Sequence, residues 1–250
     1  MFAAVIVGCN GPVSPRAKEL LVSAYRSYEA GNDEVTISKA SEFLAAKSSG
    51  LRADEGYYLR GMARYRSENR EGAAADLNAA VAKTANGELR AKARVALGDI
   101  AYDSGRMALA ENMYRRSLAD VPQDQKPADH AGYRLGCVLQ RQGRWADADL
   151  QFDRVLYLFR ETDLARQAAR RTHCVAWTIQ AGVYRSKPVA EHEAGELHTR
   201  DLPAKVEVVV LDGSPAFVVQ LGRFAAYEQT QAALVTARKL RPKAFIFPTR

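Results

Sequence analysis

Two short segments near the C-terminus share the pattern Gln-x-Gly-x-aromatic, and they hold the residues of this chain best suited to binding chemistry. They are Gln180–Tyr184 and Gln220–Phe224, and their glutamines lie 220 − 180 = 40 residues apart. A glutamine amide both donates and accepts hydrogen bonds, and a glycine leaves room for a ligand to approach the backbone. Together with an aromatic ring, these residues predict a surface for a flat, partly polar ligand.

Each pattern lies in a segment that reads as a β-strand, because apolar residues such as Ile179 and Leu221 alternate with the pattern positions. Side chains of a strand alternate between two faces, so the apolar face should pack against helices and the other should stay open. The open face is predicted to hold a glutamine, a glycine and an aromatic residue from each strand: Gln180, Gly182, Tyr184, Gln220, Gly222 and Phe224.

Residues 175–250 read as strand, helix, strand, strand, helix, strand. The predicted strands are 175–184, 206–211, 217–224 and 244–247, with a helix after Ser186 and a second at 227–240. This order predicts a ferredoxin-like, RNP-like α+β fold, in which a four-stranded antiparallel sheet carries two helices on one face. The first and third strands should be central neighbours, which would place the two Gln-x-Gly-x-aromatic patterns side by side.

The segment resembles the sporulation-related repeat (SPOR) domain, on the residues Ile179–Tyr184 and Val219–Phe224. The resemblance implies binding of peptidoglycan, specifically of septal glycan strands from which the stem peptides have been removed. Gln180 and Tyr184 match the first-strand glutamine and aromatic residue of the family. Arg223 stands where the family has proline in its Gly-Pro-Phe.

A sugar ligand agrees with the chemistry of these residues, because pyranose rings offer apolar faces to aromatic rings and polar groups to amides. Muramic acid without its peptide carries a carboxylate, with which Arg185 or Arg223 could pair. The residues predicted to bind the glycan are Gln180, Gly182, Tyr184, Arg185, Gln220, Gly222, Arg223 and Phe224.

Residues 16–174 form a second predicted domain, built of helical repeats. A unit that begins at Leu97-Gly98 recurs at Leu135-Gly136, and looser copies are anchored at Gly61 and Ala24. The anchor spacings are 61 − 24 = 37, 98 − 61 = 37 and 136 − 98 = 38 residues, and the pattern resembles the tetratricopeptide (TPR) repeat. The resemblance implies an α-helical solenoid in which each hairpin buries its apolar face against the next.

The solenoid is expected to end in a closing helix at 162–169. Its concave groove would bind an unknown partner protein, or the solenoid would serve as a spacer, and the sequence leaves both readings open. Arg64, Arg94 and Arg134 lie at positions where they could bind a carboxylate.

Residues 1–15 contain Ile6-Val7-Gly8-Cys9, which resembles a bacterial lipobox followed by a linker. The resemblance implies lipidation at Cys9 and a lipid anchor in the outer membrane, facing the periplasm. The alternative is an apolar tail tucked against a domain, and no Lys or Arg precedes Cys9 to form the basic part of a secretory signal.

The composition of the 250 residues, 47% hydrophobic and 26% charged, is that of a globular protein. The net charge of +7 includes no run of like charges, so it does not predict a dedicated nucleic-acid binder. The chain lacks a CxxC motif, and no metal site or cofactor is expected. Cys137 and Cys174 are expected to be buried free thiols in successive helices.

The sequence is compatible with three functions. The first is a non-enzymatic cell-envelope protein that binds peptidoglycan through residues 175–250 and a partner through its repeats, because no catalytic motif is present. The second is an RNA-binding module, since RNA recognition domains use the same βαββαβ sheet. The third is a TPR scaffold whose C-terminal domain only mediates dimerisation.

Overall fold

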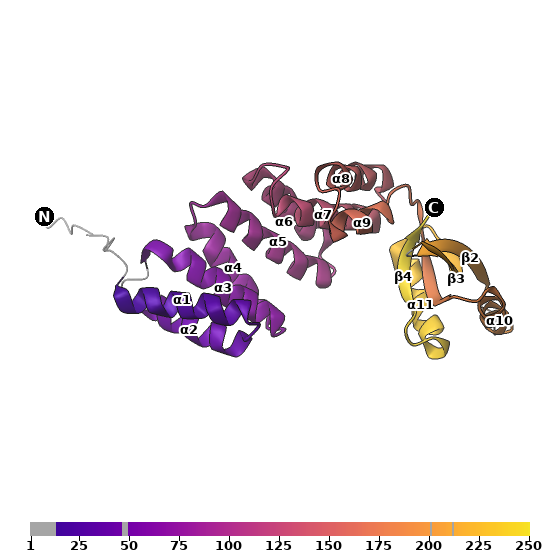
Figure 1. Cartoon of the computed structure of the whole chain (residues 1–250), viewed down its shortest axis with the longest axis horizontal. Helices are drawn as coiled ribbons and strands as arrows, with labels where there is room; N and C mark the ends of the chain where they lie inside the picture. The colour runs from indigo at the N-terminus through magenta and orange to yellow at the C-terminus, as the bar shows by residue number, and fades with distance from the viewer. Residues whose placement is uncertain (1–13, 47–49, 201, 212) are drawn as a thin grey trace, which may run out of the picture. The chain divides into compact units, whose positions relative to one another are not determined.

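The computed structural model describes residues 14–250 except 47–49, 201 and 212, so Cys9 and the lipobox lie outside the described residues. The chain divides into two compact units, of which the first ends at Leu135 and the second spans Gly136–Arg250. In the described part of the chain, helices follow one another from Pro15 to Ala169 (Figure 1). Their bounds are α1 Pro15–Glu29, α2 Asp33–Ala45, α3 Ala53–Arg66, α4 Arg70–Lys83, α5 Gly87–Asp103, α6 Met107–Asp120, α7 Ala128–Arg141, α8 Trp145–Leu158 and α9 Asp163–Ala169, with a 3₁₀ turn at Gly50–Arg52.

The helices pair into hairpins, and the residue types at their ends explain where each begins and turns. Ser14 accepts a hydrogen bond from the backbone N–H of Ala17 in the first turn of α1, and Asn32 accepts one from Val35 in the first turn of α2. Gly31, Gly105 and Gly143 adopt positive φ angles of 74°, 73° and 74° at the turn into the second helix of a hairpin. The predicted TPR-like repeats and the closing helix are therefore confirmed.

A second class of glycine allows the two helices of a hairpin to approach. A Cβ atom built on Gly98 of α5 would lie 2.5 Å from the ring of Tyr114 in α6, and one on Gly136 of α7 would lie 2.5 Å from Phe152 in α8. Both rings are fully buried. A glycine at this repeat position therefore lets the two helices of a hairpin pack closely.

Gly98→Ala is expected to lower the free energy of unfolding of the first unit by up to about 2 kcal/mol. Overpacking costs about 1–3 kcal/mol, and the better helix propensity of alanine returns about 1. The control is Gly195→Ala in α10, where a Cβ meets nothing within 4 Å and the change should stabilise. Urea unfolding followed by circular dichroism measures the stability of both variants. If Gly98→Ala changed the stability in the same direction and by the same amount as Gly195→Ala, the packing argument would be contradicted.

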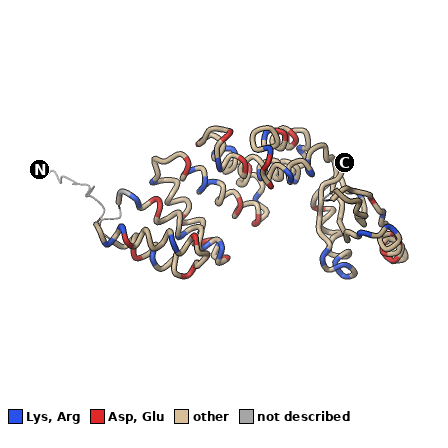
Figure 2. The backbone as a smooth tube through the Cα atoms, in the orientation of Figure 1, with Lys and Arg blue, Asp and Glu red and all other residues tan. Residues whose placement is uncertain are grey.

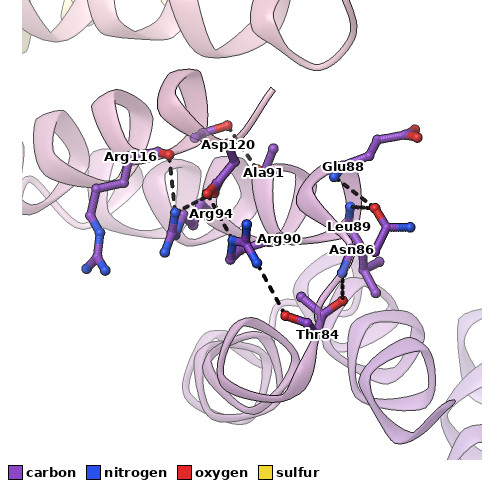
Figure 3. A network of polar contacts seen from close by, with 10 residues as sticks. Thr84, Asn86, Glu88, Leu89, Arg90, Ala91, Arg94, Arg116 and Asp120 are labelled. Carbon is purple, nitrogen blue, oxygen red and sulfur yellow. Dashed lines mark hydrogen bonds and ion pairs between the residues drawn. The ribbon is translucent and has the colours of Figure 1, made fainter. Parts of the chain in front are cut away.

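The arginines that the sequence singled out as carboxylate binders do bind carboxylates, all within the first unit. Arg64 lies 2.8 Å from Asp76, and Arg134 lies 2.7 Å from Asp99. Arg94 pairs with Asp120, which Arg90 also contacts at 2.9 Å (Figure 3). Basic and acidic residues are interspersed along the described helices (Figure 2). These arginines therefore serve the packing of the repeats.

The second unit contains, besides α8 and α9, a four-stranded antiparallel sheet with the strand order β2-β3-β1-β4. Its elements are β1 Ala176–Tyr184, α10 Lys187–His198, β2 Ala204–Leu211, β3 Ser214–Phe224, α11 Tyr227–Leu240 and β4 Phe245–Thr249. The predicted βαββαβ order and the central β1–β3 pair are both confirmed. Ser186 stands at the N-cap of α10 as expected, but its side chain makes no capping hydrogen bond.

One face of the sheet is covered by α10 and α11. Ile179 and Val219 of the central strands pack there against Ala194 and Leu197 of α10 and Ala237 of α11. The opposite face is left without a helical layer of its own in this domain, as the sequence predicted.

Aromatic residues join α8 to the sheet domain within the second unit. The rings of Trp145 in α8 and Trp177 in β1 are 5.2 Å apart, and Tyr227 of α11 meets Trp177 edge-on at 4.9 Å. The guanidinium of Arg141 lies 4.3 Å from the Tyr227 ring centre and donates a 2.7 Å hydrogen bond to its hydroxyl. Trp177 is therefore part of the core.

Cys137 and Cys174 are buried free thiols, as expected. The prediction that both lie in helices is wrong for Cys174, because α9 ends at Ala169 and Cys174 lies in the segment before β1. Among residues 14–250 with the stated gaps, no helix is long and apolar enough to cross a membrane, and no cluster of potential ligands could hold a metal ion.

Candidate binding face of the sheet

A β-bulge in β1 decides which side chains reach the open face. Gln180 pairs with Gln220 and Gly182 pairs with Val219, so Ala181 is an extra residue without a partner. A bulge of this kind reverses the alternation of the strand beyond it. Val183, which pairs with Val218, therefore joins Gln180 on the open face.

The prediction that Tyr184 shares a face with Gln180 is wrong for this reason. Tyr184 packs against the core beneath the helices, and its hydroxyl interacts with Glu193 of α10 and with Arg241. Burial raises the pKa of Tyr184, and the charge of Glu193 raises it further. Gly182 lies on this same covered face, where its missing Cβ leaves room for the Tyr184 ring.

The second pattern is divided by a bulge in the same way. Trp177 pairs with Phe224 and Ile179 with Leu221, so β3 holds one more residue than β1 around Gly222 and Arg223. Gly222 has a φ of 65°, and Phe224 packs against the core beneath the helices. The prediction that Phe224 lies beside Gln220 on the open face is therefore also wrong.

Neither of the two predicted arginines is among the residues that line the cavity of the open face, although Arg223 contacts one that is. Arg223 donates a hydrogen bond to the backbone carbonyl of Arg250. Arg185 is exposed beyond the end of β1 and does not line the cavity described next.

Gln180 and Gln220 do come together, at the centre of the open face. They are directly opposite residues of the two central strands and line a cavity of about 480 Å³. Its walls come from all four strands and from the segments that flank the sheet domain: Arg170, Cys174, Gln180, Val183, Glu207, Val208, Val209, Val210, Leu211, Val218, Gln220, Phe245, Phe247, Pro248, Thr249 and Arg250.

Gln220 is only 6% exposed, and only one of the two polar atoms of its amide has a hydrogen-bond partner among the described residues. Its Nε2 donates to the carboxylate of Glu207 in β2, whereas its Oε1 is buried without a hydrogen-bond partner among the described residues. A buried acceptor without a partner costs free energy, which a ligand donor entering the cavity would recover. The Glu207 carboxylate fixes which end of the amide remains available.

The sequence did not identify Glu207, nor the aromatic side chains of the cavity. Phe245 and Phe247 come from β4, and their rings meet edge-on with centres 6.4 Å apart. Their alternation along the last strand was a usable signal, because two residues two positions apart share a face.

The first unit contains a groove of about 420 Å³, lined by α1, α3 and α5. Three tyrosines, four carboxylates and one lysine are among its lining residues: Tyr25, Tyr28, Tyr58, Glu29, Asp54, Glu55, Glu88 and Lys92. Some of these charges are paired inside the protein. Lys92 lies 2.5 Å from Glu88, and Glu55 binds both Arg52 and the hydroxyl of Tyr25. Glu29 and Asp54 have no ion-pair or hydrogen-bond partner among the described residues.

Comparison with known families assigns the sheet domain. Residues 175–248 match the SPOR domain. A SPOR domain implies peptidoglycan binding and hence a place in the cell envelope, and neither SPOR nor TPR modules are catalytic. No curated protein resembles the chain closely enough in sequence to count as a match.

Solved structures resemble the helical part. A tetratricopeptide repeat protein from Parabacteroides merdae is 15% identical with a TM-score of 0.53, over 63% of this chain and 59% of that protein. MamA is 20% identical with a TM-score of 0.50, over 58% of this chain and 79% of MamA. The Rap conjugation regulator of plasmid pLS20, solved with the Phr* peptide, is 14% identical with a TM-score of 0.53, over 76% of this chain and 53% of Rap. At these identities the likeness establishes a TPR-like fold.

Proposed function

We propose that this protein binds peptidoglycan glycan strands stripped of stem peptides in the open-face cavity of its SPOR domain, at the division septum. The observation that carries the proposal is the half-satisfied amide of Gln220 beside Gln180 in a cavity that also presents the rings of Phe245 and Phe247. Acetamido and hydroxyl groups of a glycan supply the donors that Gln220 lacks, and aromatic side chains suit the apolar faces of its sugar rings.

The experiment is a pull-down of the purified full chain with sacculi, with and without amidase treatment that removes the stem peptides. Retention should rise after treatment, because peptides no longer block access of the glycan to the cavity. Equal or lower retention on treated sacculi contradicts the proposal. Retention on RNA that falls steeply with salt would favour the RNA-binding alternative.

We further propose that the helical groove of the first unit binds a basic segment of a partner protein, so that the repeats recruit this partner to peptidoglycan. The groove has a net charge of −3, from Glu29, Asp54, Glu55 and Glu88 against Lys92, in a protein of net charge +7. Its tyrosine rings offer flat surfaces on which arginine side chains stack. The Rap regulator, whose structure contains a peptide, shows that a related helical fold accommodates one.

A fluorescent ten-residue peptide of alternating Arg and Leu is expected to bind the full chain more tightly than the same peptide with Glu in place of Arg. Glu29→Gln and Asp54→Asn should each weaken its binding by roughly two- to fivefold, the range of one exposed ion pair. The control is Asp124→Asn, which removes an exposed carboxylate outside the groove. Anisotropy titration measures these affinities, and equal binding of both peptides would contradict the assignment.

A lipid anchor at Cys9 would hold the protein at the outer membrane with both binding surfaces in the periplasm. Labelled palmitate should be incorporated by the unmodified protein and not by Cys9→Ala.

If the C-terminal domain served only to dimerise the scaffold, Gln180 and Gln220 variants would change the oligomeric state without changing retention on sacculi.

A further inference from the structure

The open-face cavity has two arginines at one end, and both lie outside the part of the chain that matches the SPOR domain. Arg170 follows α9, and Arg250 follows β4, whereas the match covers residues 175–248. Both line the cavity, and both are exposed without an ion-pair partner among the described residues. The helical segment before the sheet and the residue after it therefore add a cationic wall to the domain.

The strand register orders the cavity from end to end. Ala176 at the start of β1 pairs with Thr249, the neighbour of Arg250. Cys174, two residues before Ala176, contacts the backbone carbonyl of Arg170 through its thiol. Gln180, in the middle of β1, pairs with Gln220 on one side and Phe245 on the other. Val183 pairs with Val218 towards the β2–β3 hairpin. A ligand lying along β1 passes from guanidinium groups, through the amides and Phe245, to an aliphatic end.

Cys174 also lines the cavity, and the pKa of its thiol depends on the charged groups around it. Burial raises the pKa of Cys174 to about 11. Arg171 and Arg250 act to lower this pKa, whereas Asp149 and Glu207 act to raise it. Opposite charges thus act within one cavity. At neutral pH the thiol is protonated, so Cys174 adds no negative charge to the arginine end.

A glycan freed of stem peptides matches this asymmetry, because its muramic acid residues carry free carboxylates and its glucosamine residues do not. A carboxylate near Glu207 would be repelled, whereas at the arginine end it would be attracted. The acetamido and hydroxyl groups of a neighbouring sugar can donate to the Oε1 atom of Gln220.

We propose that the glycan lies along the cavity in one direction, with a muramic acid carboxylate at Arg170 and Arg250 and acetamido or hydroxyl donors at Gln220 and Glu207. This inference rests on the proposed function. It makes Arg170 and Arg250 specificity-determining residues, which distinguish peptide-free muramic acid from an uncharged sugar.

Two soluble tetrasaccharides provide the test, measured by titration calorimetry with the full chain. One alternates N-acetylglucosamine with N-acetylmuramic acid and carries free carboxylates. The other is chitotetraose, which has the same acetamido groups and no carboxylate. The unmodified protein should bind the carboxylated sugar more tightly, and the difference should shrink with added salt.

Arg170→Gln and Arg250→Gln should each weaken binding of the carboxylated tetrasaccharide by roughly two- to fivefold. Binding of chitotetraose should be unchanged, and this also shows that the variants are folded. The matched control is Arg185→Gln, an exposed arginine of the same domain outside the cavity, which should alter neither affinity.

The orientation is wrong if the double variant Arg170→Gln/Arg250→Gln binds both sugars as the unmodified protein does, or loses both equally. It is also wrong if Arg185→Gln selectively weakens the carboxylated sugar. Failure of the unmodified protein to bind either tetrasaccharide or treated sacculi would overturn the proposed function itself, and the two failures are therefore distinguishable.

Discussion

Replacing Trp177 with alanine is expected to lower the free energy of unfolding of the Gly136–Arg250 unit by about 3–5 kcal/mol, the cost of removing a buried tryptophan side chain. Trp177 is 3% exposed and contacts the rings of Trp145 and Tyr227. It thus belongs at once to the sheet core and to the contact between α8 and the sheet. Most domains of this size are only about 5–15 kcal/mol stable, so the loss is a large fraction of the total.

The same contact predicts that the sheet domain depends on α8 for part of its stability. A fragment of residues 136–250 should unfold at higher urea concentration than a fragment of residues 175–250. Trp145→Ala should destabilise the longer fragment, whereas the shorter fragment does not contain residue 145. Equal midpoints for the two fragments would show that the aromatic contact contributes nothing.

Tyr227→Phe provides the control, because it keeps the ring against Trp177 and removes only the hydroxyl that accepts from Arg141. The expected cost is about 1 kcal/mol, that of one hydrogen bond. Fluorescence of the two tryptophans follows unfolding directly, since both belong to this cluster.

The sequence predicted the topology of both parts because topology depends on signals that extend over many residues. The glycines of the repeats recur at a fixed spacing, and Gly98 and Gly105 each meet a separate steric requirement. The order of strands and helices after residue 175 likewise leaves few arrangements, and it placed Gln180 beside Gln220.

The composition of the binding face was predicted only in part, because it depends on single-residue bulges. Ala181 is an ordinary residue for a strand, and nothing in its type indicates that it has no partner in β3. One extra residue sufficed to move Tyr184 beneath the helices and to bring Val183 to the open face. The presence of Arg170 in the cavity could not be predicted from the sequence for another reason, because the position of Arg170 depends on the path of the chain after α9.

The bulges lead to the second prediction, in which the two halves of each Gln-x-Gly-x-aromatic pattern have different effects. Gln180→Ala and Gln220→Ala should each weaken retention on amidase-treated sacculi by about 2- to 12-fold, from the loss of one hydrogen bond of about 0.5–1.5 kcal/mol. The double variant should weaken retention by about 4- to 150-fold, the product of two such losses. Stability should change little, because Gln180 is half-buried and Gln220 is already missing one partner.

Tyr184→Ala and Phe224→Ala should behave in the opposite way. Both side chains pack against the core beneath the helices, so their removal should lower the free energy of unfolding by about 2–4 kcal/mol, somewhat less than for fully buried aromatic residues. At urea concentrations below the unfolding midpoint, the molecules of these two variants that remain folded should bind treated sacculi with the affinity of the unmodified protein. Tyr184→Phe keeps the packed ring and should bind as the unmodified protein does.

Sedimentation assays with treated sacculi give the affinity, and urea unfolding of the same samples gives the stability. If Tyr184→Phe lost binding at unchanged stability, the tyrosine hydroxyl would contact the glycan and the ligand would lie near α10 instead of in the open cavity. If the glutamine variants bound normally, the orphaned acceptor of Gln220 would have no part in recognition. The face of the sheet that holds the glycan is decided by which of these two pairs of variants loses affinity.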